Sequence, residues 1–272
     1  MSSNDIQTWN RVNIPTSNYL YGIAYGADKY IAVGDYGTLI SSSDGINWTV
    51  QKALSMIQAT YITYAKNIFL VVGTDGALFI SNNGINWLPL NSLTSKGLFF
   101  AGFVQGKFFI SGEDGFIGYS TDGVDWNAAT TNLQKETIVS IVSDGTKFLA
   151  FSSSGKVLVS NDGITWSASF DLGANTTVNS AIYNNGYFIA VGIKIDYTTK
   201  PIPAHYNIFR SKDGKNWEFV PVVNKNSINI VAYDGNYILT IPGGIRYSNN
   251  MVNWSSAFMG SRCTIQSLVR VN

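Results

Sequence analysis

Short hydrophobic segments of two kinds follow one another along the whole chain. Alternation of apolar and polar residues, as in 21–25 and 59–64, is typical of a strand with one buried face. After a short turn comes an almost unbroken apolar run, such as 30–33 or 68–72, which is typical of a strand covered on both faces. No segment shows the 3.6-residue period of an amphipathic helix. The pattern therefore predicts an all-β protein.

One motif, Ser-x-Asp/Asn-Gly-x-x-Trp, recurs between the third and fourth predicted strands. The Asp or Asn side chain accepts hydrogen bonds from amides ahead of it, and the glycine adopts a positive φ without steric cost. Each copy therefore predicts a tight hairpin. The tryptophan then either fills space between neighbouring sheets or offers a platform for a sugar ring. The paired positions, including a worn first copy and a last copy without glycine, are Asp5 and Trp9, Asp44 and Trp48, Asn83 and Trp87, Asp122 and Trp126, Asp162 and Trp166, Asp213 and Trp217, and Asn250 and Trp254.

The spacing of the motif defines a repeat. Consecutive tryptophans lie 39, 39, 39, 40, 51 and 37 residues apart. A period near forty residues with four strands is typical of a β-propeller with one blade per repeat. We expect a single β-propeller domain over 1–272, with six complete four-stranded blades and a partial seventh sector built from the two termini, 1–12 and 264–271. Closure is then six-fold or seven-fold, or a second subunit completes the gap.

Antiparallel strand order separates two ends of each blade. With strands A to D in sequence order, the motif hairpins and the A–B turns share one end, and the B–C loops lie at the other. The longest repeat gains its extra residues in a B–C loop, 193–204, either as a binding insertion or as a tolerated surface insertion. The candidate ligand-binding residues of this end are Asp35, Tyr36, Asp75, Glu113, Asp114, Asp196, Tyr197, His205 and Tyr206.

Composition narrows the possible functions. A net charge of +1 with 13% charged residues gives no electrostatic footprint for nucleic acid. No apolar run is long enough to span a bilayer, and the first residues lack signal-peptide features, so a cytoplasmic or virion-associated location is expected. Cys263 and His205 are the only residues of their kinds, which excludes an internal disulfide, a thiolate metal cluster and a zinc site made of these two residues. We expect no cofactor, no metal site and no catalytic residues.

The repeated motif resembles the Asp box, or BNR repeat, of sialidases and of related bacterial and bacteriophage propellers. The copies here are one residue shorter than Ser-x-Asp-x-Gly-x-Thr-Trp and are similar to those of the photosystem II assembly-factor propeller. The resemblance implies a structural hairpin away from the ligand face. It also implies that a sialidase would need three converging arginines. This chain has five, with none between Arg11 and Arg210; the others are Arg246, Arg262 and Arg270.

These observations predict a non-catalytic, lectin-like propeller that recognises a carbohydrate or another cell-surface ligand. The near-neutral charge and the many tyrosines favour this function. A bacteriophage virion component is the first alternative: a tail or capsid attachment or decoration protein whose partners are neighbouring virion proteins. An intracellular assembly-factor scaffold is the second, and a sialidase-like glycoside hydrolase is the least favoured. The incomplete seventh sector is compatible with a homo-oligomer.

Overall fold

The computed structural model describes residues 5, 7–55, 58–195, 204–221, 229–233, 236–241, 244–259 and 267. Within these ranges the chain forms six four-stranded antiparallel sheets, here called blades 1 to 6, each with its strands in sequence order. The helical content of the described ranges is two short 3-10 turns, η1 (Thr74–Gly76) and η2 (Glu113–Gly115). The predicted all-β class and the six complete four-stranded blades are therefore confirmed.

The six blades fall into two compact units, with blades 1–3 in unit 1 and blades 4–6 in unit 2. Blade 1 comprises β1 (Leu20–Gly26), β2 (Lys29–Gly34), β3 (Leu39–Ser42) and β4 (Thr49–Val50); blade 2 comprises β5 (Ala59–Ala65), β6 (Ile68–Gly73), β7 (Leu78–Ser81) and β8 (Leu88–Pro89); blade 3 comprises β9 (Leu98–Val104), β10 (Lys107–Gly112), β11 (Ile117–Ser120) and β12 (Asn127–Ala128).

Unit 2 repeats the same arrangement. Blade 4 comprises β13 (Ile138–Ser143), β14 (Phe148–Ser152), β15 (Lys156–Ser160) and β16 (Ser167–Asp171); blade 5 comprises β17 (Thr176–Asn184), β18 (Tyr187–Ile195), β19 (Ala204–Ser211) and β20 (Glu218–Pro221); blade 6 comprises β21 (Asn229–Tyr233), β22 (Asn236–Ile241), β23 (Gly244–Ser248) and β24 (Ser255–Met259).

The second strand of each blade lies at the centre of the packing. Along β6 the side chains alternate between the two faces of the sheet. Phe69 and Val71 belong to a core shared with blade 1, whereas Leu70 and Val72 belong to a core shared with blade 3. The unbroken apolar runs in the sequence exist because blades cover both faces of these strands. Strand β18 in unit 2 has the same arrangement. Phe188 and Ala190 belong to a core shared with blade 4, and Ile189 and Val191 belong to a core shared with blade 6.

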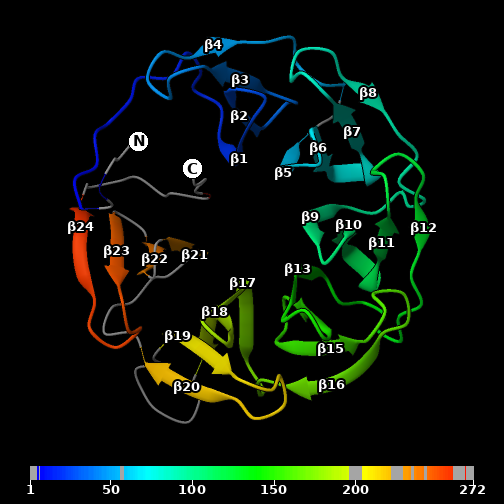
Figure 1. Ribbon diagram of the computed structural model, residues 1–272, viewed down its shortest axis with the longest axis vertical. Coiled ribbons are helices and arrows are strands. Elements are labelled where there is room, and N and C mark those ends of the chain that lie inside the picture. The colour runs from blue at the N-terminus through cyan, green and yellow to red at the C-terminus, as the bar shows by residue number, and fades with distance from the viewer. Residues whose placement is uncertain are drawn as a thin grey trace. The chain divides into compact units, whose positions relative to one another are not determined.

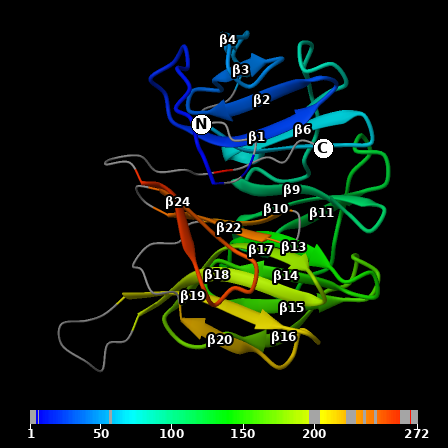
Figure 2. The same cartoon turned by 60° about the vertical axis from the view of Figure 1, so that its left-hand side comes forward.

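The first strands of successive blades are neighbours within each unit. In unit 1, β1 contacts β5 and β5 contacts β9, so the first strands line one edge of the unit and β4, β8 and β12 line the opposite edge (Figure 1). Figure 2 shows the long strands β1 and β2 from the side. The B–C loop of blade 1 also reaches blade 2, because Asp35 forms an isolated β-bridge with Gln58, just before β5.

The predicted seventh sector required strands from the two ends of the chain, over 8–12 and 264–271. The worn first motif forms its turn, because Asp5 Oδ1 accepts the amides of Gln7 and Thr8 at 2.9 and 2.7 Å. The expected fourth strand over 8–12 is reduced to a bridge residue at Asn10. Residues 1–4, which were expected to supply the end of a third strand beside it, lie outside the described residues. The expected first strand over 264–271 lies outside the described residues, apart from Ser267.

The long B–C loop of blade 5 is shorter than the sequence predicts. Strand β18 continues to Ile195 and β19 begins at Ala204, with Ile195 paired to Ala204 and Lys194 to His205. The hydrophobic and β-branched residues on both sides extend the ladder into the predicted loop. Asp196 and Tyr197 lie outside the described residues.

Candidate functional site

The seven motif hairpins share one hydrogen-bond pattern. In each copy the Asp or Asn Oδ1 accepts the backbone amides two and three residues ahead, at 2.7 to 2.9 Å. In the six copies after the first, the serine hydroxyl accepts the amide three residues ahead of it. For example, the Gly163 amide donates to Ser160 Oγ at 2.8 Å. These turns use the acidic residues as backbone acceptors, so the motif residues have a structural role.

The glycine of the motif lies against the preceding blade. A Cβ at Gly84 would overlap Cδ1 of Ile31, and a Cβ at Gly214 would lie 2.8 Å from Cδ1 of Leu149. Both glycines also have a positive φ, of 67° and 73°. The hairpin tip is therefore a contact point between blades, and the glycine is selected by both space and backbone conformation.

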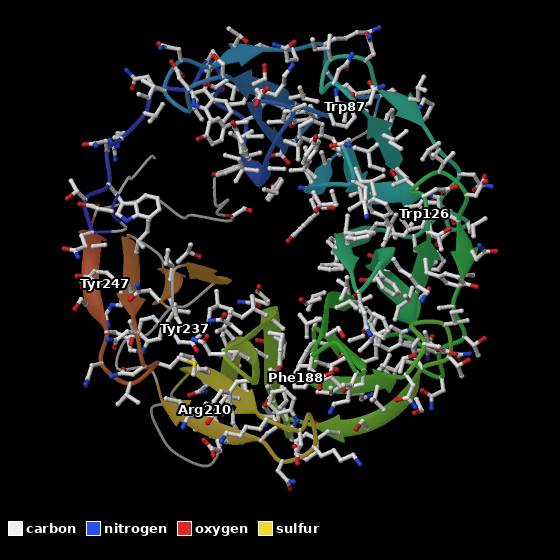
Figure 3. All side chains as sticks on the ribbon, in the orientation of Figure 1. Trp87, Trp126, Phe188, Arg210, Tyr237 and Tyr247 are labelled. Carbon is white, nitrogen blue, oxygen red and sulfur yellow. The ribbon has the colours of Figure 1, made fainter. Side chains whose placement is uncertain are left out.

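The tryptophans pack between blades. Trp166 is 3% exposed and its Nε1 donates to the Gly163 carbonyl at 3.2 Å. Trp217 of blade 5 lies with its ring centroid 5.7 Å from that of Phe151 in blade 4. Figure 3 shows Trp87 and Trp126 in blades 2 and 3 of unit 1. Trp126 and Trp166 are buried and the other five tryptophans are half-buried. Four of the seven pack in clusters shared by two neighbouring blades, as expected for wedges between sheets: Trp87, Trp126, Trp217 and Trp254.

The electrostatics of the hairpins agree with this structural role. The backbone amides of Asn47 and Ile46 hold the pKa of the Asp44 carboxyl well below its usual range. The amides two and three residues ahead likewise lower the pKa of Asp122, Asp162 and Asp213. A catalytic acid requires a raised pKa, so these carboxylates are unsuited to proton donation at neutral pH.

The B–C loops lie at the opposite end of each blade, as the strand order predicts. In blades 1 to 3 the second loop residue has a left-handed backbone, with φ of 56°, 56° and 54° at Tyr36, Asp75 and Asp114. Aspartate tolerates this region, but a bulky side chain is strained there. Tyr36 is nevertheless 73% exposed, so packing does not compensate the strain. This outlier marks blade 1 as a candidate functional position.

A group of polar side chains surrounds Asp35. Its Oδ1 accepts the Tyr21 hydroxyl at 3.1 Å and Gln58 Nε2 at 3.0 Å. Its amide donates to the carbonyl of Tyr19 at 3.0 Å, and the Tyr19 side chain is 76% exposed. Burial, and then the hydrogen bond to Asp35, raise the pKa of Tyr21. The Asp35 carboxylate is thus held in place by Tyr21 and Gln58, and the backbones of two residues with exposed rings, Tyr19 and Tyr36, adjoin it.

The sequence did not single out Tyr19 or Gln58. Both precede the first strand of a blade, Tyr19 before β1 and Gln58 before β5. Both residues contact the B–C loop of blade 1 at Asp35. This shared position identifies them, but it can be recognised only when the contacts between the loop and the first strands are known. Gln58 forms an isolated β-bridge with Asp35, which joins blade 1 to blade 2.

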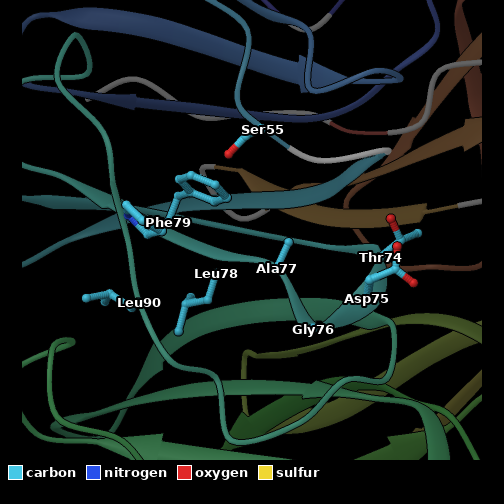
Figure 4. A pocket seen from close by; sticks show the side chains of 9 residues that line it. Ser55, Thr74, Asp75, Gly76, Ala77, Leu78, Phe79 and Leu90 are labelled. Atoms are coloured by element: carbon cyan, nitrogen blue, oxygen red, sulfur yellow. The ribbon is translucent and has the colours of Figure 1, made fainter.

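A pocket of about 560 Å³ opens beside Asp75 in blade 2. In Figure 4, Thr74 and Asp75 lie together on one side, and Leu78, Phe79 and Leu90 lie on the other. Ser55, from the connection between blades 1 and 2, contributes an exposed hydroxyl. The pocket therefore combines an apolar wall with hydrogen-bonding groups, the usual composition of a small-ligand site.

Of the remaining predicted residues, some have side chains bound to other residues, and the side chains of the others lie outside the described residues. Glu113 accepts the amide of Gly97 at 2.9 Å, and Asp114 forms an ion pair with Lys96 at 3.0 Å. His205 and Tyr206 lie in the ladder of β19, opposite Lys194 and Ile193, rather than in a loop. Their side chains are outside the described set. All five described acidic and tyrosine positions of these loops, Asp35, Tyr36, Asp75, Glu113 and Asp114, thus lie in unit 1, and Glu113 and Asp114 are engaged by partners that directly precede β9 of blade 3.

A second hollow lies at the hairpin end of blade 1. It has a volume of about 720 Å³ and is lined by residues 10–15 and by Ile46, Asn47 and Trp48. Arg11 lines this hollow, whereas Arg210 Nε donates to Glu218 at 2.8 Å in blade 5.

The described residues show neither a metal-binding cluster nor a membrane-spanning helix. Among the described residues, no group of three or more His, Cys, Asp or Glu side chains is placed to hold a metal ion. In the same residues, no helix has the length and apolar character needed to cross a membrane.

Comparison with known proteins gives the fold a context. No protein-family model matches the sequence, and neither does any curated protein. Among solved structures, the chain is similar to YCF48 bound to D1 peptide, with a TM-score of 0.70, 14% identity, and coverage of 93% of this chain and 87% of that chain. It is also similar to the Neurospora crassa Pan2 WD40 domain, with a TM-score of 0.67, 10% identity, and coverage of 91% and 81%. A computationally designed protein, Ika8, matches with a TM-score of 0.61, 9% identity, and coverage of 92% of each chain. These likenesses show the fold of the chain, which is a β-propeller.

Proposed function

We propose that this protein is a non-catalytic binding propeller whose ligand contacts the B–C loops of blades 1 and 2. The observation that carries the proposal is Tyr36, which is exposed in a left-handed conformation where blades 2 and 3 have aspartate. A strained residue without packing contacts to compensate it is favoured by selection when its side chain meets a ligand. Tyrosine is among the residues that contribute most to binding energy at interfaces.

The polar surroundings of Tyr36 support recognition rather than catalysis. Asp35 accepts hydrogen bonds from two neutral groups, Tyr21 and Gln58, and its amide donates to the carbonyl of Tyr19, whose side chain is also exposed. The motif carboxylates at the other end of the blades are used as amide acceptors. The motif chemistry also supports our assignment of these hairpins to a shortened Asp box, whose role in the chain is structural.

A mutant pair tests the proposal. Tyr36→Asn removes the ring and suits the left-handed backbone, whereas Ile85→Asn removes a residue that is 59% exposed at a hairpin tip of blade 2, at the opposite blade end. Labelled wild-type protein and both variants are applied to glycan arrays, peptide arrays and intact bacterial cells. We expect binding by wild type and Ile85→Asn, and a loss of about tenfold or more in Tyr36→Asn.

The outcomes distinguish ligand binding from enzymatic cleavage of the ligand. Absence of binding by the folded wild-type protein, or an equal loss in both variants, would overturn the proposal. The ligand recovered after binding is analysed by mass spectrometry, where an unchanged mass is expected and a cleaved product would show that the protein is an enzyme.

A peptide or protein ligand is the second candidate. It is supported by the likeness to YCF48, whose structure contains a D1 peptide. The peptide arm of the same experiment decides between the two, because Tyr36→Asn is compared on both ligand types. Attachment to a host cell as part of a bacteriophage particle would use the same surface, and the intact-cell arm tests it.

A further inference from the structure

Resting on the proposed function, we infer that the ligand is a neutral oligosaccharide that extends from the Tyr19–Tyr36 pair of blade 1 into the pocket of blade 2. The two parts of this surface lie within unit 1 and are joined by two contacts of Gln58. The first is the contact between Asp35 and Gln58, and the second is a hydrogen bond from the Thr74 amide to the Gln58 carbonyl at 3.1 Å. Thr74 lines the pocket, so Gln58 lies between the tyrosine pair and the pocket.

A second connection runs along the other side. The amide of Leu54 donates to the carbonyl of Gly37 at 2.9 Å, directly after Tyr36 in the chain. Ser55 follows Leu54 and lines the pocket. The turn of blade 1 is therefore tied to the pocket lining through both Gln58 and Leu54. A ligand that contacts both the tyrosine pair and the pocket spans two blades, which suits several sugar units rather than one.

The tyrosine pair supplies the chemical groups that a sugar ring requires. The side chains of Tyr19 and Tyr36 are both largely exposed, and the backbones of both residues adjoin Asp35, whose carboxylate is oriented by the Tyr21 hydroxyl and Gln58 Nε2. Aromatic faces attract the apolar C–H faces of sugars, and an oriented carboxylate accepts hydrogen bonds from their hydroxyls. Burial of an aromatic face beside an oriented acceptor is a combination that discriminates hydroxyl-bearing ligands.

The charges of the surface decide which glycans it favours. The charged side chains named for this surface are the carboxylates of Asp35 and Asp75. Its other polar side chains carry hydroxyl groups or, at Gln58, an amide. Sialylated, sulfated or phosphorylated ligands would meet like charges here. Hydroxyl donors of a neutral glycan match these acceptors. A lysine-rich peptide is the competing ligand, and it would depend on ionic attraction.

The test uses an array of neutral, sialylated and sulfated glycans together with lysine-rich peptides. The strongest neutral glycan is then titrated against wild type, Asp35→Asn and Asp28→Asn at low and high salt. Asp28 lies in the A–B turn at the other end of blade 1, so the control removes the same charge from the same blade. We expect a weakening of about tenfold for Asp35→Asn, none for Asp28→Asn, and a dissociation constant independent of salt.

Each result is informative. Binding confined to acidic glycans, or binding to lysine-rich peptides that weakens steeply with salt, overturns this inference and leaves the proposed binding function standing. Binding to a neutral glycan that Asp35→Asn does not weaken also overturns it. Absence of binding to every ligand class, with intact folding by circular dichroism, overturns both this inference and the proposed function.

Discussion

Gly84 at the tip of the blade 2 hairpin lies directly against Ile31 in the second strand of blade 1, so closely that a Cβ on Gly84 would overlap Cδ1 of the isoleucine. The contact explains why a motif that is formed by local hydrogen bonds also organises the packing between blades. The hairpin and the neighbouring sheet share one surface, and the missing side chain creates the space for it. The motif of blade 3 is seated in the same way, with Gly123 against Ile68.

Replacement of Gly84 by alanine is expected to lower the free energy of unfolding by roughly 2–4 kcal/mol, because it adds both a clash and a strained φ. Chemical denaturation measures the change. Gly106→Ala is the control for backbone strain alone, since Gly106 has a φ of 84° and open space around it. Its expected cost is about 1 kcal/mol.

The clash itself is isolated by a double-mutant cycle with Ile31→Val. Valine lacks Cδ1, so the alanine at position 84 should cost less in this background than in wild type. An equal cost in both backgrounds would show that Ile31 does not restrict the hairpin.

Acid sensitivity should arise in part from the motif aspartates. Their amide partners lower the pKa of Asp44, Asp122, Asp162 and Asp213 in the folded state. A carboxyl whose folded pKa lies below its unfolded value of about 3.9 contributes stability above that pH. The contribution is lost as the pH falls through the folded pKa. Stability should therefore decrease below about pH 4.

The variant with all four aspartates changed to asparagine tests this origin. Asparagine already occupies the position at Asn83 and Asn250 and accepts the same two amides. Because asparagine cannot carry the charge that these amides stabilise, we expect the variant to melt at a lower temperature than wild type at pH 7, with a smaller difference between the two proteins at pH 2 and a shallower decline in the variant between pH 4 and pH 2. Parallel melting curves for the two proteins over that range would contradict the assignment.

The indole nitrogens provide a third prediction. Trp166 donates to the Gly163 carbonyl, whereas the buried Nε1 of Trp87 has no hydrogen-bond partner among the described residues. Phenylalanine removes a hydrogen bond at position 166 but only an unpaired donor at position 87. Trp166→Phe should therefore be more destabilising than Trp87→Phe by about 1 kcal/mol in urea denaturation. A larger loss at Trp87 would indicate that volume, not hydrogen bonding, determines the cost.

Stability and binding should change in opposite directions at Tyr36. Asparagine suits the left-handed backbone, so Tyr36→Asn is expected to raise the free energy of unfolding by about 0.5–1 kcal/mol while it weakens ligand binding. Thermal melting and the binding assay are performed on the same preparation. Ile85→Asn, at an exposed position, should leave the melting temperature nearly unchanged. A destabilised Tyr36→Asn protein would show that the tyrosine has a packing role.

The sequence predicted features whose chemistry is local. Asp44 and the amides of Ile46 and Asn47 are neighbours in the chain, so the hairpin follows from the motif alone. The strand order, the ends of the blades and the position of Tyr36 follow from the repeat. The pairing of Asp35 with Gln58 joins residues of different blades, and nothing in the sequence specifies it.

The sequence also could not separate similar turns. Asp35 and Glu113 are both acidic residues that open a B–C loop. Only the structure shows that the Gly97 amide binds the Glu113 carboxylate, whereas side-chain donors orient Asp35. The extra length of this repeat predicted a loop over 193–204. Lys194 and His205 carry no turn signal, however, and they pair across the ladder of β18 and β19.

The outermost strands of the two units differ in length, and this difference bears on aggregation. In unit 1, β4, β8 and β12 are two residues long, and β8 ends in proline, so each presents too few free backbone groups to template a foreign strand. In unit 2, β16 and β24 are five residues long and offer a longer free edge. We expect concentrated or partly denatured protein to begin polymerising at the blades of unit 2.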